Sequence, residues 1–493
     1  MGRGQHFEQP IRSSKPIGRG RLPLVLLLLI LWSAALAPAQ AERVQVREDF
    51  SRDPGWLGRN NLPSPSAYKI TTQDFGYSPT AHAGGRPGEI GGAISRSLTP
   101  ARYAKVIPTR TLNDRLHASG KFAVTRSNSS GGALIGWFND ASRGWRTPNS
   151  LVFRLDGERG RFRVFFEYGT QTWKAGGGAT FEGKWQTTTT PMFVADGAPH
   201  AWSLDYDPAG ANGAGEITFT LDGKPYKAAL RPGHKEEGAV FDRFGILNQQ
   251  GAGGTLTLWL DDLALDGEAQ DFSTDPGWEG RGNRVTFQDF GVRPVHDFGY
   301  RTTSRAGGQP GEIGGRIWRT GAAQPDAACH YGTPVGRLSM DDELRASGKV
   351  SLCAASADSA VLIGWYNSRT AVGAPPPNFI GVFVEGPSRI GHYFRPVYGG
   401  TDGRKRITNA GPIIRPDSAS HTWTLHYEPK ANDGRGRITV TLDGKDVSLD
   451  LISERHKGGA NFDRFGVVSW SNGGHFVEIY FDDLSYTAQR LIP

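Results

Sequence analysis

The 493-residue sequence predicts an all-β protein built from two tandem β-sandwich domains. Three observations support this prediction: motifs that return in the same order in the second half of the chain, short stretches of alternating apolar and polar residues, and high counts of glycine (67) and proline (31). Alternation is typical of half-buried strands, and glycine and proline favour the turns between them. The chain is also too long for one hydrophobic core, so at least two domains are expected.

The internal repeat is the strongest signal in the sequence. Its matching segments are residues 49–56 and 271–278, 74–77 and 297–300, 87–92 and 310–315, 221–224 and 442–445, and 241–245 and 462–466. Because their order is preserved along the whole chain, we interpret the repeat as a duplication. It predicts a first domain over residues 42–267 and a second domain over residues 268–493.

The expected strands occur in both copies of the repeat. Apolar and polar residues alternate over residues 151–155, 161–168, 200–206, 216–221, 421–427 and 437–442. The pairs Asp222-Gly223 and Asp443-Gly444 each follow such a stretch, which is a hairpin signal. No stretch shows a sustained helical period. Many short strands separated by turns predict that each copy is a β-sandwich.

The first 41 residues have the pattern of a signal peptide. A basic segment precedes an apolar run over residues 22–37, and Ala39-Gln40-Ala41 resembles a signal-peptidase site. The run is shorter than the roughly 20 apolar residues that cross a bilayer. The alternative is an uncleaved N-terminal anchor. Both interpretations predict that the rest of the chain is secreted, periplasmic or at the cell surface, with no membrane span after the signal peptide.

Most of the net positive charge of the chain lies in residues 1–41. Residues 1–41 carry five basic residues and one acid, so the formal net charge of +7 falls to +3 without them. A net charge so close to zero gives no electrostatic footprint for nucleic acid. We therefore expect no nucleic-acid partner.

The two cysteines of the chain, Cys329 and Cys353, lie in the second copy. An exported protein folds in an oxidising compartment, where such a pair is commonly bridged. The first copy has no cysteine, which indicates that the two cysteines were gained or lost together. The sequence predicts a disulfide between them.

The pattern of residues 202–206, 217–223 and 241–245 resembles concanavalin A-like (laminin-G-like) jelly rolls, and residues 423–466 repeat it. The resemblance covers most of each copy but rests on a fold-level pattern. It implies two antiparallel sheets per domain, one of them often concave and used to bind or cleave glycans. A shared fold does not fix the function.

Several enzyme classes are disfavoured by missing motifs. The sequence has no Glu-X-Asp motif, no Gly-X-Ser-X-Gly elbow, no His-Glu-X-X-His and no Walker loop. We therefore expect a carbohydrate-binding protein whose partner is a polysaccharide or glycan. One alternative is a polysaccharide lyase or glycoside hydrolase, with catalytic candidates Glu89, Glu167, Arg154 and Tyr168. For Glu89 the competing interpretation is a turn acid. The other alternative is a structural or adhesive envelope protein.

The first copy holds the better candidate for sugar binding. Sugars stack on aromatic rings and hydrogen-bond to charged and amide groups. The predicted ligand-binding residues are Trp137, Asn139, Trp145, Arg154, Glu167, Tyr168 and Trp173. Alternation places Arg154 opposite Phe153, so Arg154 is expected on an open face. The competing interpretation of Trp137 is a core residue.

Acidic residues at the ends of each copy indicate calcium as a structural cofactor. The expected ligands are Asp49, Asp262, Asp271 and Asp483. If the first and last strands of each copy are neighbours, Asp49 approaches Asp262 and Asp271 approaches Asp483. Carboxylate oxygens are the ligands that calcium prefers. The alternative is that these acids are solvated turn residues.

Overall fold

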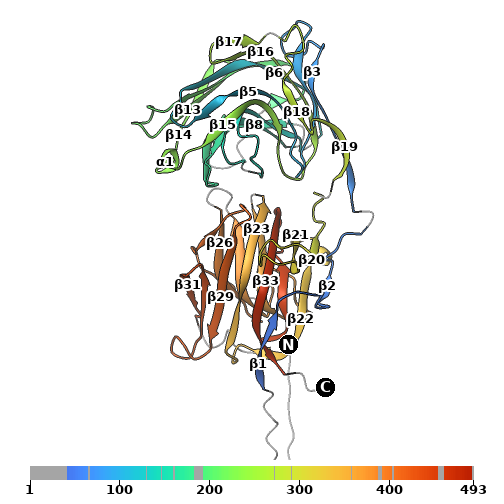
Figure 1. The fold of residues 1–493 in the computed structure, drawn as a ribbon, viewed down its shortest axis with the longest axis vertical. Helices are drawn as coiled ribbons and strands as arrows, with labels where there is room; N and C mark the ends of the chain where they lie inside the picture. Colours follow the sequence, from blue (N-terminus) through green and yellow to red (C-terminus); the bar gives the residue numbers. More distant parts are fainter. Residues whose placement is uncertain are drawn as a thin grey trace, which may run out of the picture. The chain divides into compact units, whose positions relative to one another are not determined.

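The structure is a computed structural model that describes residues 42–64, 67–128, 130–145, 147–158, 161–181, 193–270, 272–289, 291–356, 358–386, 391–401, 405–452 and 460–490. The predicted signal peptide (1–41) and Asp271 lie outside the described residues. Nearly all regular structure in the described part is strand, arranged in four antiparallel sheets (Figure 1). The predicted all-β fold class is confirmed. Among the described residues, no helix has the length and apolarity needed to span a bilayer.

Two sheets form the N-terminal sandwich. The first has the strand order β14 (Lys224–Ala229), β13 (Glu216–Leu221), β12 (Pro199–Asp207), β6 (Leu116–Ser127), β16 (Thr255–Leu265), β4 (Glu89–Ser95), β3 (Lys69–Ser78) and β19 (Arg284–Asp289), with β17 (Glu268–Gln270) beside β16. The second has the order β10 (Ala175–Ala179), β9 (Arg161–Gly169), β8 (Ser150–Glu158), β7 (Gly132–Phe138), β15 (Val240–Asn248), β5 (Arg102–Thr111) and β18 (Glu279–Arg281), with β11 (Phe193–Val194) beside β9. One apolar core lies between them.

The C-terminal sandwich repeats this arrangement. Its first sheet has the order β20 (Asp297–Arg301), β21 (Glu312–Trp318), β33 (Phe476–Gln489), β23 (Leu344–Ala355), β29 (Ser420–Glu428), β30 (Arg437–Leu442) and β31 (Lys445–Asp450), with β1 (Arg43–Glu48) beside β33. Its second has the order β2 (Leu57–Arg59), β22 (His330–Ser339), β32 (Asn461–Ser469), β24 (Ser359–Tyr366), β25 (Phe379–Gly386), β26 (His392–Gly399) and β27 (Lys405–Ile407), with β28 (Ile413–Ile414) beside β26.

Both predicted hairpins are present. Leu221 pairs with Lys224 across Asp222-Gly223, and the C-terminal sandwich repeats this at Asp443-Gly444. The φ angles of Asp222 (48°) and Gly223 (79°) are both positive. Two consecutive positive φ angles are the signature of the type I′ turn, whose twist matches that of the flanking strands.

The N-terminal segment of the chain completes the C-terminal sandwich. Strand β1 pairs antiparallel with β33, beside which it lies in Figure 1 (blue against red), and β2 pairs with β22. Between these strands, Phe50 and Trp56 are buried in the core of the C-terminal sandwich. The first repeat motif, residues 49–56, therefore packs with the second copy of the repeat.

The matching motif of the second copy packs on the N-terminal sandwich. Strand β17 pairs with β16, β18 with β5, and β19 with β3, while Phe272 and Trp278 enter the N-terminal core. The predicted boundary between residues 267 and 268 separates the two copies of the sequence repeat. It does not separate the two sandwiches, because each sandwich contains strands from both copies. The prediction that Asp49 approaches Asp262 is wrong, because Asp49 directly follows the strand that pairs with β33.

Candidate functional site

The sheet that contains β7, β8 and β9 carries most of the predicted ligand-binding residues. Along β8, Phe153 packs in the main core, whereas Val152 belongs to a separate apolar cluster with Leu134 and Phe138. Since successive side chains on a strand point to opposite faces, Arg154 lies on the outer face with Val152. The predicted orientation of Arg154, away from Phe153, agrees with this.

Trp137 lies in the core and not on the outer face. Its side chain is 0% exposed, and its ring packs edge-on against Phe244 with centroids 5.1 Å apart. The prediction that Trp137 binds a ligand is wrong. Both faces of β7 are covered by apolar neighbours, so hydrophobicity does not distinguish the inward Trp137 from the outward Phe138.

Tyr168 also points into the core. Its hydroxyl lies 2.8 Å from Nδ1 of His234 and accepts a hydrogen bond from the backbone N–H of Arg231 at 2.9 Å. Its neighbour Glu167 points to the other face of β9. The prediction of Tyr168 as a ligand-binding or catalytic residue beside Glu167 is wrong, because strand geometry separates the two side chains.

Arg154 and Glu167 meet on the outer face as a buried ion pair. Nε of Arg154 donates to Oε1 of Glu167 at 3.0 Å, and Asp156 accepts from the same guanidinium. The indole of Trp145 covers this group, with its centroid 5.8 Å from Arg154 and 4.9 Å from the guanidinium of Arg96. Arg154 is only 2% exposed. The prediction that Arg154, Glu167 and Trp145 form an open ligand-binding or catalytic site is therefore wrong. The ion pair instead supports Trp145 and the loop between β7 and β8 that carries it.

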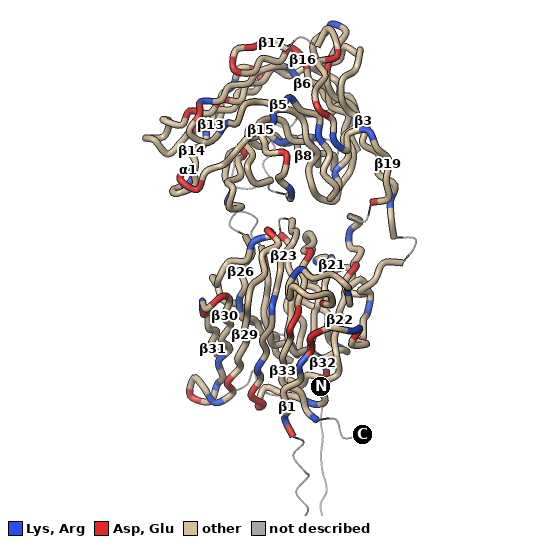
Figure 2. The backbone as a smooth tube through the Cα atoms, viewed as in Figure 1, with Lys and Arg blue, Asp and Glu red and all other residues tan. Residues whose placement is uncertain are grey.

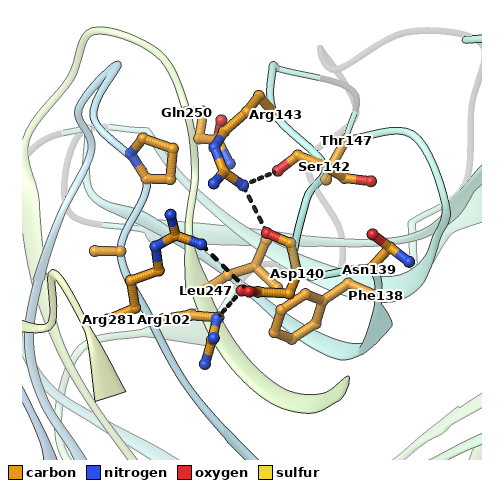
Figure 3. A pocket seen from close by; sticks show the side chains of 12 residues that line it. Arg102, Phe138, Asn139, Asp140, Ser142, Arg143, Thr147, Leu247, Gln250 and Arg281 are labelled. Atoms are coloured by element: carbon orange, nitrogen blue, oxygen red, sulfur yellow. Dashed lines mark hydrogen bonds and ion pairs between the residues drawn. The ribbon is translucent and has the colours of Figure 1, made fainter. Parts of the chain in front are cut away.

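A small pocket opens beside this loop (Figure 3). Its charged and polar lining residues are Arg102, Asn139, Asp140, Ser142, Arg143, Thr147, Gln250 and Arg281. Asn139 was predicted to bind a ligand and lines the pocket. The cavity volume of about 20 Å³ accommodates roughly one water-sized group. A larger ligand would place only one substituent inside.

Asp140 is the centre of the pocket's hydrogen bonds. Its carboxylate accepts from Nε of Arg102 and, at 3.2 Å, from Arg281. Arg143 donates to the backbone carbonyl oxygens of Asp140 and Ser142, both at 2.7 Å. Burial raises the pKa of Asp140, but the hydrogen bond from Arg102 and the nearby arginine charges outweigh it, so the pKa lies below its usual value. Asp140 is therefore ionised at neutral pH.

Trp173 packs on the same loop. A Cβ placed on Gly144 would lie 2.4 Å from the Trp173 ring, so glycine is required for this approach. The backbone N–H of Gly144 donates to the side chain of Gln250, which lines the pocket, at 2.7 Å. Trp173 is half-buried and has a φ of 67°. A positive φ is costly for an aromatic residue, and such strain is concentrated at functional positions.

The equivalent place in the C-terminal sandwich has different side chains. Tyr366 stands where the first copy has Phe138, and its hydroxyl lies 3.2 Å from Nδ1 of His330, the equivalent of Arg102. Tyr366 is fully buried. His330 and Tyr366 thus replace Arg102 and Phe138, which line the pocket of the N-terminal sandwich.

Glu89 holds a turn in place. Its carboxylate accepts hydrogen bonds from the backbone N–H groups of His82 (2.9 Å) and Ala83 (2.8 Å), and the side chain is fully buried. In the second copy Glu312 accepts from the N–H groups of Arg305 and Ala306. The prediction of Glu89 as a catalytic residue facing a cleft is wrong, because the chain folds over it.

The acids predicted to bind calcium have other partners. Asp262 pairs with Lys121 at 2.8 Å, and Asp483 pairs with Lys349 at 2.7 Å. Asp49 is exposed and accepts hydrogen bonds from Ser51. Within the described ranges, no three His, Cys, Asp or Glu side chains gather as a metal site would require. Calcium remains a prediction.

The predicted disulfide is absent. Cys329 and Cys353 are both free thiols. Cys329 is buried in the core at the start of β22, whereas Cys353 lies on β23 of the other sheet. Its sulfur lies 3.5 Å from the hydroxyl of Ser351, on the face away from Leu352. The prediction is wrong because alternation along β23 turns Cys353 away from the core.

No family model and no curated protein matches the chain. Solved structures similar to it include domains LG4-5 of the mouse laminin alpha1 chain (12% identity, 80% of this chain and 89% of that chain, TM-score 0.24). Others are peanut lectin (12%, 40% and 91%, 0.24) and an endo-1,3-beta-glucanase from Streptomyces sioyaensis (12%, 46% and 99%, 0.19). The predicted resemblance to laminin-G-like and lectin sandwiches agrees with these similarities. Because the TM-scores are below 0.5, no activity or residue role is transferred from these proteins.

Sequence reasoning missed the arginines of the pocket. Arg281 belongs to the second copy of the repeat and reaches Arg102 only because β18 pairs with β5. Arg143 lies two residues before Trp145, in a loop whose sequence differs between the copies. This difference between the two copies is the sequence signal that points to the loop of Arg143.

Proposed function

We propose that the protein is a secreted carbohydrate-binding protein whose binding site is the pocket of the N-terminal sandwich, with Trp173 beside it. The observation that supports this proposal most directly is the combination of hydrogen-bonding groups in the pocket with Trp173, a half-buried, strained tryptophan that packs against Gly144 of the pocket loop. Amide, hydroxyl and guanidinium groups bind sugar hydroxyls, and an aromatic ring stacks on the apolar face of a sugar.

The charges in the pocket favour binding over hydrolysis. Glycosidases use two carboxyl groups, one of them protonated as the general acid. Among the residues that the structure describes, Asp140 is the one carboxylate that lines the pocket, and its pKa is below the usual value because the arginine interactions outweigh burial. A carboxylate held in this way is a poor proton donor. Asp140 is therefore unsuited to be the general acid of a glycosidase, which favours the proposal that the pocket binds glycans without cleaving them.

A panel of polysaccharides tests this proposal when binding and product release are scored together. We expect binding to at least one polysaccharide without the appearance of new reducing ends or unsaturated products. Trp173→Ala should weaken that binding by about 1–3 kcal/mol, the range for a central aromatic contact. Product release that depends on Asp140 would contradict the proposal and favour an enzyme.

Asn139 and Asn367 offer a matched pair of variants. The side-chain oxygen of Asn139 accepts from the N–H of Ala141, and that of Asn367 accepts from the N–H of Arg369. Replacing either with alanine removes the same type of turn contact. We expect only Asn139→Ala to weaken glycan binding, because Asn139 lines the pocket, whereas beside Asn367 the lining residues Phe138 and Arg102 are replaced by Tyr366 and His330.

A further inference from the structure

We infer that the pocket of the N-terminal sandwich selects carbohydrates that carry a carboxylate or sulfate group, which Arg102, Arg143 and Arg281 would hold. This inference rests on the proposed carbohydrate-binding function and names its ligand class.

The lining of the pocket is predominantly cationic. Three arginines line it, against Asp140 as the lining acid. Two of these arginines, Arg102 and Arg281, hydrogen-bond to the Asp140 carboxylate. Outside the pocket, Glu279 pairs with Arg243 at 3.1 Å and lies 3.4 Å from Arg102. The negative charges of Asp140 and Glu279 offset the positive charge of Arg102 and part of that of Arg281. The positive charge of Arg143 is left uncompensated.

Arg143 has no carboxylate partner among the described residues. Its guanidinium donates to two backbone carbonyl oxygens, those of Asp140 and Ser142. Burial lowers the pKa of Arg143, and the neighbouring charges of Arg281 and Arg102 lower it further against the effect of Asp140. A bound anion would relieve this repulsion. The guanidinium plane also matches the paired oxygens of a carboxylate or sulfate.

The size of the pocket fits a substituent and not a sugar ring. About 20 Å³ is enough for one water-sized group. An acidic oxygen can therefore enter while the ring of the sugar stays outside the pocket. Arg281, whose side chain is 55% exposed, is accessible to the same ligand from solvent.

The second copy lacks this charge. The positions of Arg102, Asp140 and Arg143 are held there by His330, Ser368 and Ala371. Burial, together with the charges of nearby arginines, lowers the pKa of His330 to about 4, so this histidine is neutral at pH 7. Arg59 pairs opposite His330 as Arg281 pairs opposite Arg102, and it is therefore the counterpart of Arg281 in the C-terminal sandwich.

Calorimetric titration of the purified full chain with three probes tests the inference: a polyuronate, a sulfated polysaccharide and a neutral glucan. We expect one or both acidic polymers to bind at least about tenfold more tightly than the glucan, with an affinity that falls as salt is added. The two acidic probes distinguish a carboxylate ligand from a sulfate ligand.

Three variants locate the interaction. Arg143→Gln and Arg281→Gln should each weaken binding of the acidic polymer by about tenfold, the loss expected for one charge-assisted contact. Arg143→Lys keeps the charge without the planar fork and should give an intermediate loss. Arg59→Gln is the matched control and should bind as the parent does. Melting curves of all four proteins verify that each is folded.

Each result decides between the two proposals. Equal affinity for neutral and acidic polymers would overturn the inference and leave the proposed function in place. An equal loss in Arg59→Gln and Arg281→Gln would also overturn it, because binding would then follow net charge alone. Absence of binding to every polymer, acidic or neutral, would overturn both.

Discussion

The backbone carbonyl oxygen of Phe50 lies against Gly311: a Cβ on that glycine would be 2.0 Å from the oxygen. The equivalent contact in the N-terminal sandwich joins Phe272 to Gly88, at 1.9 Å. Glycine in the repeated Pro-Gly-Glu-Ile motif thus makes room for the segment that the other copy of the repeat supplies. This contact explains why both motifs recur together in the sequence.

The exchange of segments predicts which sandwich each mutation destabilises. Phe50 and Phe272 are both buried, the first in the C-terminal core and the second in the N-terminal core. Phe50→Ala should cost about 3–5 kcal/mol, the range for truncation of a buried phenylalanine. We expect hydrogen exchange to increase in residues 297–490 for Phe50→Ala and in residues 69–289 for Phe272→Ala. The opposite pattern would contradict the exchange.

Asp261 predicts a pH dependence of stability. Burial raises its pKa to about 6, and the negative charges of Asp262 and Glu89 act in the same direction. The folded state therefore binds a proton more tightly than the unfolded chain, whose aspartates titrate near pH 4. The stabilising contribution is complete below about pH 4 and is lost as the pH rises through 6.

Replacing Asp261 by Asn should remove this loss. We expect Asp261→Asn to be more stable than the parent at pH 7 by on the order of 2–3 kcal/mol, in buffer with EDTA. The two proteins should converge near pH 4. Asp262→Asn removes one of the neighbouring negative charges, so it should lower the pH at which the stability is lost without removing the loss. Parallel profiles for Asp261→Asn and the parent would refute the assignment.

The calcium prediction is tested by melting curves at pH 7 with calcium and with EDTA. Calcium that binds only the folded state raises the melting temperature in proportion to the logarithm of its concentration. We expect this rise, and we expect Asp262→Asn and Asp483→Asn each to reduce it. A melting temperature that is the same in calcium and in EDTA would rule the cofactor out.

The free thiols give a prediction that is simple to measure. Mass spectrometry of the alkylated, unreduced protein should show two modified cysteines. Cys353 should react before denaturation, since it is partly exposed, and Cys329 only after it, since burial raises its pKa and shields it. Reductant should leave the melting temperature unchanged. A mass two units lower than that of the dithiol, without alkylation, would show a disulfide after all.

The fold could be predicted because its signals are local. Alternation over residues 151–155 and 161–168 marks strands regardless of what packs on them, and Asp222-Gly223 favours one turn type. The candidate site could not be predicted to the same degree. Arg154 was assigned to the right face, but whether a loop covers that face depends on tertiary packing. Which sandwich residues 49–56 pack against also depends on tertiary packing, since both sandwiches accept nearly the same motif.

The pairing of Arg43 with Gln489 also constrains how the molecule is made. Residues 43–59 are synthesised before the N-terminal sandwich, whereas β33, the strand partner of β1, is synthesised after it. Residues 69–289 form the other sandwich as one continuous stretch and can fold during synthesis. The C-terminal sandwich must wait for a contact that spans nearly the whole chain, and contacts so distant in sequence form slowly. Until then, the core that receives Phe50 and Trp56 stays open to water.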